Sequence, residues 1–267
     1  MYKLKWKTVY VVVILLLFNT IEISFFIANV AKIKERWMFL FFEFGIFMIM
    51  YVWYYARKIN NRFTQFVELG KFSASLQELS EDDAIPKFST HLIYLTKADK
   101  RHEIEDKVIK SIFSKKPKRA DVYWFLHINR TSHPYTLSYD VSELLDDKII
   151  KVNINIGFRI QPKTELYFKK IVQDLVKNKE LNLHIRPDGS SKYNNEPDFK
   201  FVVIEKFLSV ENEFALREGL LLNAYFKLKH MGLRDEKAFG LDKSDVVVEQ
   251  IPLVYQPMQQ IDLIRVE

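Results

Sequence analysis

The 267-residue sequence contains no cysteine and only seven glycines. Without cysteine the chain cannot form disulfides, thiol nucleophiles, iron–sulfur clusters or cysteine-bound zinc sites. The glycines stand too far apart for a GxGxxG motif or a P-loop, at positions 45, 70, 157, 189, 219, 232 and 240. These absences exclude thiol chemistry and nucleotide binding in a glycine-rich cradle.

Catalytic sequence motifs are missing too. The six histidines form no HExxH motif, and no two of them are separated by three or four residues. A GxSxG nucleophile elbow is also absent. The sequence therefore predicts a protein that is not an enzyme and that uses no metal or other cofactor.

The positive charge is confined to one part of the chain. The formal net charge is +6, and residues 1–59 carry eight Lys or Arg residues but only three acids. The other 208 residues hold 32 basic and 31 acidic residues. A nucleic-acid-binding domain needs a basic surplus on its own surface. The sequence thus predicts no nucleic-acid partner.

Two long apolar segments are present near the N-terminus. Thr8–Ala28 and Trp37–Tyr55 are each about 20 residues long, which is enough for a helix to cross a hydrocarbon core of about 30 Å. The first is too long for the apolar part of a signal peptide. Joined by Asn29–Arg36, the two predict an antiparallel transmembrane hairpin over residues 1–56, with spans at about 8–28 and 37–55.

Basic residues around the two spans indicate their orientation. The outer flanks carry more of them than the link between the spans, and such residues favour the cytoplasmic side. We therefore expect a multi-pass protein of the cell membrane, in contact with the lipid bilayer and with both termini in the cytoplasm. The outer flanks supply Lys3, Lys5, Lys7, Arg57, Lys58 and Arg62, against Lys32, Lys34 and Arg36 in the link.

Each span contains one acid, Glu22 or Glu43, and an antiparallel hairpin would bring them to a similar depth. An ionisable group inside a membrane span is a candidate functional residue, and two neighbouring carboxylates would favour a protonated form. The alternative is that each side chain makes a hydrogen bond to a neighbouring helix. Both interpretations stay open at this point.

A second region, residues 57–85, has apolar residues at helical spacing between basic ones: Ile59, Phe63, Phe66 and Val67. This pattern predicts an amphipathic juxtamembrane helix and a linker. Pro86 then begins a domain over residues 86–267.

Strand-like and helix-like segments alternate through residues 86–267. This order predicts an α/β domain with a mixed β-sheet. The polar loop 186–198 is expected to be disordered. The expected strands are 91–96, 121–128, 135–141, 148–160, 199–208 and 245–250, and the expected helices are 103–114, 162–178 and 211–231, the last burying Leu220, Leu221, Ala224, Tyr225 and Leu228.

Several strings resemble, in the right order, the last two membrane helices and the cytosolic region of the KUP (HAK/KUP/KT) family of potassium uptake permeases. They are IEISFFIANVAKI, KKPKRADVYWFLHINRTSHPYT, the GFR of Gly157–Arg159, FKFVVIEKFLS and DEKAFGLDKSDVVVEQIPLV. The resemblance implies about twelve membrane helices in the complete bacterial transporter, whose earlier helices handle potassium and, in symport, the proton. The chain alone is then expected not to transport, because the ion-binding residues lie outside it.

The resemblance also implies regulation. The cytosolic domains of the family are expected to pair as a homodimer, and in some bacterial relatives the region is similar to a receptor for cyclic di-AMP. A regulatory ligand site is expected near Asp198, Phe201, Lys229 and His230, with His230 at a phosphate and Phe201 stacked on a base. The alternative is that Phe201 is a core residue and His230 a solvated helix end.

A different class of protein is also compatible with the sequence. The chain could be an independent membrane-tethered sensor or scaffold whose cytosolic domain binds a small anionic ligand such as a cyclic dinucleotide. In-frame DNA upstream of Met1 that encodes further apolar spans would favour the permease, and a stop codon there would favour the tethered domain.

Overall fold

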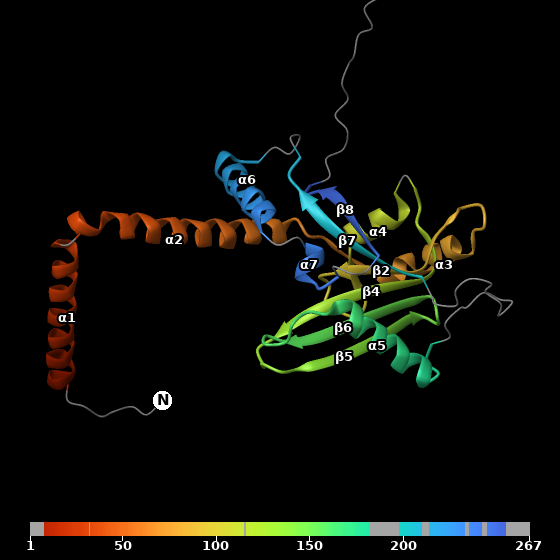
Figure 1. Ribbon diagram of the computed structural model, residues 1–267, viewed down its shortest axis with the longest axis horizontal. Coiled ribbons are helices and arrows are strands. Elements are labelled where there is room, and N and C mark those ends of the chain that lie inside the picture. Colours follow the sequence, from red (N-terminus) through yellow and green to blue (C-terminus); the bar gives the residue numbers. More distant parts are fainter. Residues whose placement is uncertain are drawn as a thin grey trace, which may run out of the picture. The chain divides into compact units, whose positions relative to one another are not determined.

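The computed structural model describes residues 8–31, 33–114, 116–181, 198–209, 214–232, 235–241 and 245–254. The chain divides into two units, Met1–Tyr55 and Ala56–Glu267. Figure 1 labels their helices and strands.

The first unit is helical. It holds α1 (Thr8–Ala31) and most of α2 (Ile33–Arg62), within which Val9–Val30 and Trp37–Arg62 are long and apolar enough to cross a membrane. The hydroxyls of Thr20 and Ser24 donate to backbone carbonyls one turn earlier, at 2.8 Å each, so these polar groups need no water. Two apolar helices are thereby confirmed, while their pairing as a hairpin stays a prediction.

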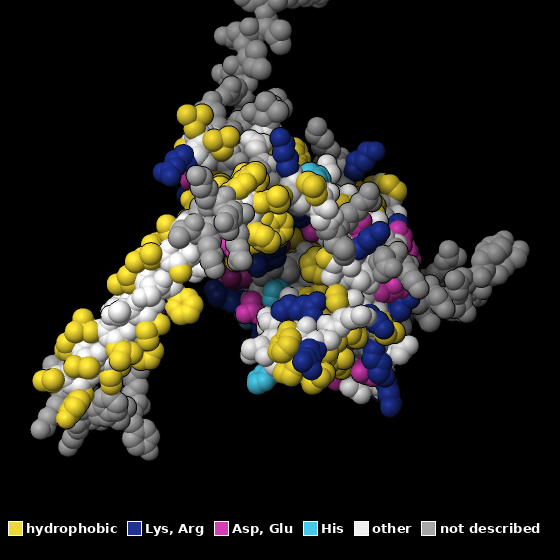
Figure 2. All heavy atoms as spheres, turned by 60° about the vertical axis from the view of Figure 1, so that its left-hand side comes forward, with side chains coloured by type: hydrophobic (Ala, Val, Ile, Leu, Met, Phe, Trp, Pro, Cys, Tyr) yellow, Lys and Arg dark blue, Asp and Glu magenta, His cyan; other side chains and the backbone are white. Residues whose placement is uncertain are grey.

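Hydrophobic side chains cover the helical part of the chain, whereas Lys, Arg, Asp and Glu side chains are spread over the domain (Figure 2). Nearly all described side chains between Val9 and Tyr55 are exposed. Water would solvate such a surface poorly and lipid would cover it.

The region after the second apolar helix differs from the sequence prediction. Helix α2 itself continues to Arg62, and the apolar residues predicted to form a separate juxtamembrane helix do not form one. Phe66 and Val67 instead lie in β1 (Phe66–Glu68), which pairs antiparallel with β3 (Glu103–Glu105). Pairing with a distant strand outweighs the helical spacing of these residues. The 3-10 helix η1 (Leu69–Phe72) and α3 (Ser73–Glu81) complete the segment.

A six-stranded mixed sheet forms the centre of the second unit, as predicted. Its strand order is β5-β6-β4-β2-β7-β8, and all neighbours run parallel except β5 and β6. The strands are β2 (Lys87–Thr96), β4 (Arg119–Thr131), β5 (Leu137–Leu145), β6 (Ile149–Gly157), β7 (Phe199–Phe207) and β8 (Val246–Pro252).

Hydrophobic clusters cover both faces of this sheet. On one face, Tyr123 and Phe125 of β4 pack with residues of α3 and α4 (Asp106–Phe113). On the other, Trp124 packs with Phe168 and other residues of α5 (Thr164–Lys177). Alternate residues of β4 therefore serve opposite faces, which explains its nearly continuous apolar sequence.

The remaining helices are α6 (Leu216–Met231) and α7 (Asp235–Ala238). The predicted core face of α6 is partly wrong, because Leu220 is 71% exposed, whereas Leu222, Tyr225 and Phe226 are buried. Apolar residues surround most of this helix, so spacing alone does not select the buried side. The predicted disordered loop 186–198, except Asp198, lies outside the described residues.

Candidate functional site

The last residues of α2 belong to the second unit and make several contacts with other parts of it. The Arg62 guanidinium donates to the Glu218 carboxylate of α6 at 2.9 Å, and the Phe63 ring lies 5.7 Å from that of Phe214. The backbone N–H of Asp106 donates to the carbonyl of Gln65 at 3.0 Å. These contacts fix the residues that follow the membrane helix.

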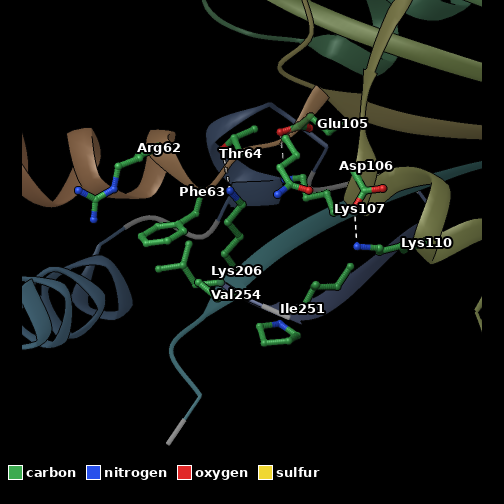
Figure 3. A pocket seen from close by; sticks show the side chains of 13 residues that line it. Arg62, Phe63, Thr64, Glu105, Asp106, Lys107, Lys110, Lys206, Ile251 and Val254 are labelled. Carbon is green, nitrogen blue, oxygen red and sulfur yellow. Dashed lines mark hydrogen bonds and ion pairs between the residues drawn. The ribbon is translucent and has the colours of Figure 1, made fainter. Parts of the chain in front are cut away.

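A cavity of about 170 Å³ lies beside this attachment. Its lining comes from the end of α2 and the residues after it, from β3 and α4, and from the ends of β7 and β8 (Figure 3). Figure 3 shows side chains from these segments converging on the same space. The charged residues lining it are Arg62, Glu105, Asp106, Lys107, Lys110 and Lys206.

Three of the four cations around the cavity have a carboxylate partner. Arg62 pairs with Glu218, Lys110 with Asp106 at 2.5 Å, and Lys107 with Glu105 at 3.4 Å. The Glu105 side chain is only 1% exposed. Burial, despite this carboxylate, lowers the pKa of Lys107 below its usual range.

Lys206 has a different environment. Its ammonium group donates to Thr64 Oγ1 at 2.7 Å and to Asn60 Oδ1 at 3.2 Å, both of which are neutral acceptors. Burial, with the neighbouring ammonium groups of Lys107 and Lys97, lowers the pKa of Lys206 to about 8. Among the described residues, Lys206 is therefore the lining cation that forms no ion pair, and Glu105 attracts it only from beyond contact distance.

This lowered pKa predicts a pH-dependent stability difference between the wild type and a Lys206→Met variant. Between about pH 8 and pH 10.5 the unfolded chain holds a proton on Lys206 that the folded chain has lost, so folding becomes more favourable as pH rises. Below pH 8 the charged, partly buried Lys206 costs about 1–2 kcal/mol, a figure reduced for its contact with solvent.

Thermal unfolding of the full chain in detergent, without phosphate, measures this difference. We expect Lys206→Met to be more stable than the wild type at pH 7, with the advantage gone near pH 10.5. Comparing the two proteins at each pH cancels groups that titrate in both. An advantage that stayed constant from pH 7 to pH 10.5 would contradict the lowered pKa.

The two predicted membrane carboxylates lie on different helices of the first unit. Glu22 is on α1 and Glu43 on α2, and both side chains are exposed. Their mutual approach and any role in proton handling remain predictions.

The four residues of the predicted ligand region have separate environments. The backbone carbonyl of Asp198 accepts from the N–H of His91 at 2.9 Å, just before β7. Phe201 is 1% exposed, and its ring packs edge-on against Phe168 at 5.7 Å, which is a core position. Lys229 pairs with Asp235 at 2.7 Å, and His230 is exposed at the end of α6. The buried Phe201 has no free ring face on which a base could stack.

Sequence reasoning missed the cavity. Glu105 and Lys206 are 101 positions apart, and the strand pairings that bring their segments together are not visible in local spacing. One signal was present, since Lys206 interrupts the apolar run of the predicted strand 199–208. A charge in a buried strand requires a local partner or an aqueous pocket.

Two apolar helices followed by an α/β domain with a mixed sheet define a class of membrane-anchored α/β proteins. Residues 89–254 match the family described as K+ potassium transporter C-terminal domain. The chain belongs to that family, and its resemblance to the KUP permeases is confirmed.

The related proteins carry the name probable potassium transport system protein Kup. Those of Cytophaga hutchinsonii and Flavobacterium johnsoniae are 44% and 41% identical to this chain, each over 97% of it. That of Clostridium perfringens is 31% identical over 99% of the chain. In each case the match covers 40% of the relative, so the chain spans about two fifths of their length. No solved structure matches the chain.

Proposed function

We propose that this chain is the C-terminal part of a potassium uptake transporter, in which it anchors and regulates. Its similarity to the Kup proteins over nearly its whole length supports this assignment. Potassium, and the proton in symport, would then be handled by membrane helices other than α1 and α2, with which these two would pack. Two helices enclose too little space to coordinate a dehydrated ion.

The observation that carries the regulatory role is the continuity of α2. This helix runs without interruption to Arg62, and its last residues are bound within the domain through Asn60 and Arg62. A conformational change in the domain would therefore be transmitted to the membrane helix through this hydrogen-bonded helix end. A long flexible linker in the same place would absorb such a change. The domain would lie in the cytoplasm and act as a homodimer.

Cyclic di-AMP is the regulatory ligand that the resemblance implies. The core position of Phe201 argues against base stacking at the predicted region. A membrane-tethered sensor of a small anionic ligand is the second candidate function, and the cationic cavity at the end of α2 is the observation that favours it.

Potassium uptake tests the assignment. In a bacterial strain without potassium uptake systems, this chain alone is expected to give no uptake. A fusion should restore uptake if the chain replaces the matching C-terminal part of the Cytophaga hutchinsonii protein. Ending that fusion at residue 62 should reduce uptake at least about tenfold, because the domain that holds the helix end is gone.

Membrane insertion of each fusion is checked with an epitope tag, so that a lost protein is not mistaken for a lost activity. Uptake by the chain alone would contradict the assignment as a C-terminal part. Equal uptake by the full and shortened fusions would contradict a regulatory domain.

A further inference from the structure

We propose that the cavity at the end of α2 binds a phosphate group between the ammonium groups of Lys206 and Lys107. The proposal does not depend on potassium transport, because it rests on the charges and contacts inside the second unit. It assigns a ligand class to residues that the sequence patterns do not single out.

The charge balance of the cavity favours an anion. Four cations and two carboxylates line it, and a third carboxylate, Glu218, neutralises Arg62 from α6. Within the described chain, the Lys206 ammonium group donates to the hydroxyl of Thr64 and the amide oxygen of Asn60 and has no carboxylate in direct contact, while Glu105 attracts it from a greater distance. An ammonium group has three donors, so one N–H of Lys206 remains for a ligand.

A second buried cation lies next to the first. Lys107 and Lys206 line the same cavity (Figure 3), and the positive charge of Lys107 raises the cost of charging Lys206. The Lys107 side chain is 13% exposed and has one carboxylate partner at 3.4 Å. A doubly charged anion between the two amines would remove their repulsion and form charge-assisted hydrogen bonds.

The size and position of the cavity suit a phosphate group. A water molecule needs about 10–15 Å³ of such space, so a cavity of about 170 Å³ admits a polyatomic anion. Arg62, the last residue of the second apolar helix, forms part of its wall. Lipid phosphates are enriched at the end of a membrane helix, and soluble phosphates reach the cytosolic side, so either source supplies this chemistry.

Binding is measured on the full chain in nanodiscs, with radiolabelled inorganic phosphate at fixed ionic strength. We expect saturable binding to the wild type in neutral phosphatidylcholine discs and at least a tenfold loss of affinity in Lys206→Met. The matched control is Lys169→Met on α5, whose side chain is 53% exposed and is not among the residues that line the cavity. This control should bind like the wild type.

The lipid source is distinguished in a second arm. If a lipid headgroup is the ligand, discs containing phosphatidylglycerol should raise the melting temperature of the wild type and of Lys169→Met, but not of Lys206→Met. Free phosphate should in that case have no effect. A second variant, Lys110→Met, changes the cavity rim without burying a new charge and should weaken binding less. A cooperative thermal unfolding transition without ligand shows that each variant is folded, and each melting temperature is compared with that of the same variant without ligand.

Each outcome decides the proposal. A Lys206-dependent response to inorganic phosphate assigns a soluble ligand, and a Lys206-dependent response only to phosphatidylglycerol assigns a lipid headgroup. No response in either arm, or an equal response in all variants, overturns the site. These results are independent of potassium uptake, so failure here leaves the proposed transporter role standing.

Discussion

Replacing Trp124 with alanine is expected to lower the free energy of unfolding of the domain by about 3–5 kcal/mol. Trp124 is fully buried in β4, and its ring packs edge-on against Phe168 with centroids 5.0 Å apart. Its indole N–H donates to Nδ1 of His91 at 3.2 Å. The variant loses apolar burial, opens a void on the α5 face of the sheet and takes the indole donor from a buried imidazole.

Thermal unfolding of the full chain in detergent checks this result. For a domain of this size the loss corresponds to a fall in melting temperature of about 6–20 °C. Trp124→Phe, which keeps an aromatic ring but lacks the N–H, should lie between the wild type and Trp124→Ala. Tyr135→Ala, at a ring that is 69% exposed, is the surface control and should change little. A fall of only a degree or two in Trp124→Ala would show that β4 is not at the centre of the core.

Much of the fold could be predicted because the signals are local. The expected helix 162–178 is observed at Thr164–Lys177, and the expected strand 121–128 lies within β4. The apolar residues of the first follow helical spacing, and those of the second form one continuous run. Turn-forming residues lie beside each segment. Residues 103–105 are an exception, because they form β3 in place of the first turn of the expected helix.

The errors have a common physical cause, which is that tertiary partners decide between local alternatives. Phe66 fits a helical stripe, yet its backbone pairs with Glu105 in a strand. Leu220 fits a core face, yet the packing of α6 buries Leu222 instead. Sheet order and helix packing settle such choices, and neither is encoded in local spacing.

The candidate site was the least predictable part. Phe201 and His230 were expected at a regulatory ligand site because the family resemblance implies a cyclic dinucleotide, whose base could stack on a ring and whose phosphate could meet an imidazole. The structure places the ring in the core and creates the cationic cavity from Thr64, Lys107 and Lys206. A cavity arises from what packing leaves unfilled, so residue types alone cannot locate it.

Glu105→Gln is expected to lower the free energy of unfolding by about 3–5 kcal/mol at pH 7, because it leaves a buried ammonium group without its counter-charge. The Glu105 side chain is 1% exposed, and the Lys107 ammonium lies 3.4 Å from its Oε1. Glutamine keeps the shape of the side chain and can still accept from the backbone N–H of Lys97, as Oε2 does at 3.3 Å. The substitution therefore tests the charge rather than the packing.

The pH dependence of this loss has a defined sign. Without Glu105 the pKa of Lys107, already lowered by burial, falls further, so the folded variant releases this proton at a lower pH than the unfolded chain. The destabilisation is then greatest near pH 6 and decreases as pH rises toward 10. Glu68→Gln, at an exposed pair with Lys71 at 3.7 Å, is the control and should cost less than about 0.5 kcal/mol.

The same substitution should act on phosphate binding in the opposite direction. Removing the negative charge from the cavity makes it more positive, so Glu105→Gln is expected to bind inorganic phosphate about tenfold more tightly than the wild type. Saturating phosphate should then restore much of the lost stability, because the anion takes the place of the carboxylate beside Lys107. A variant with lower stability and unchanged phosphate affinity would place the anion elsewhere, and one with unchanged stability would contradict the buried ion pair itself.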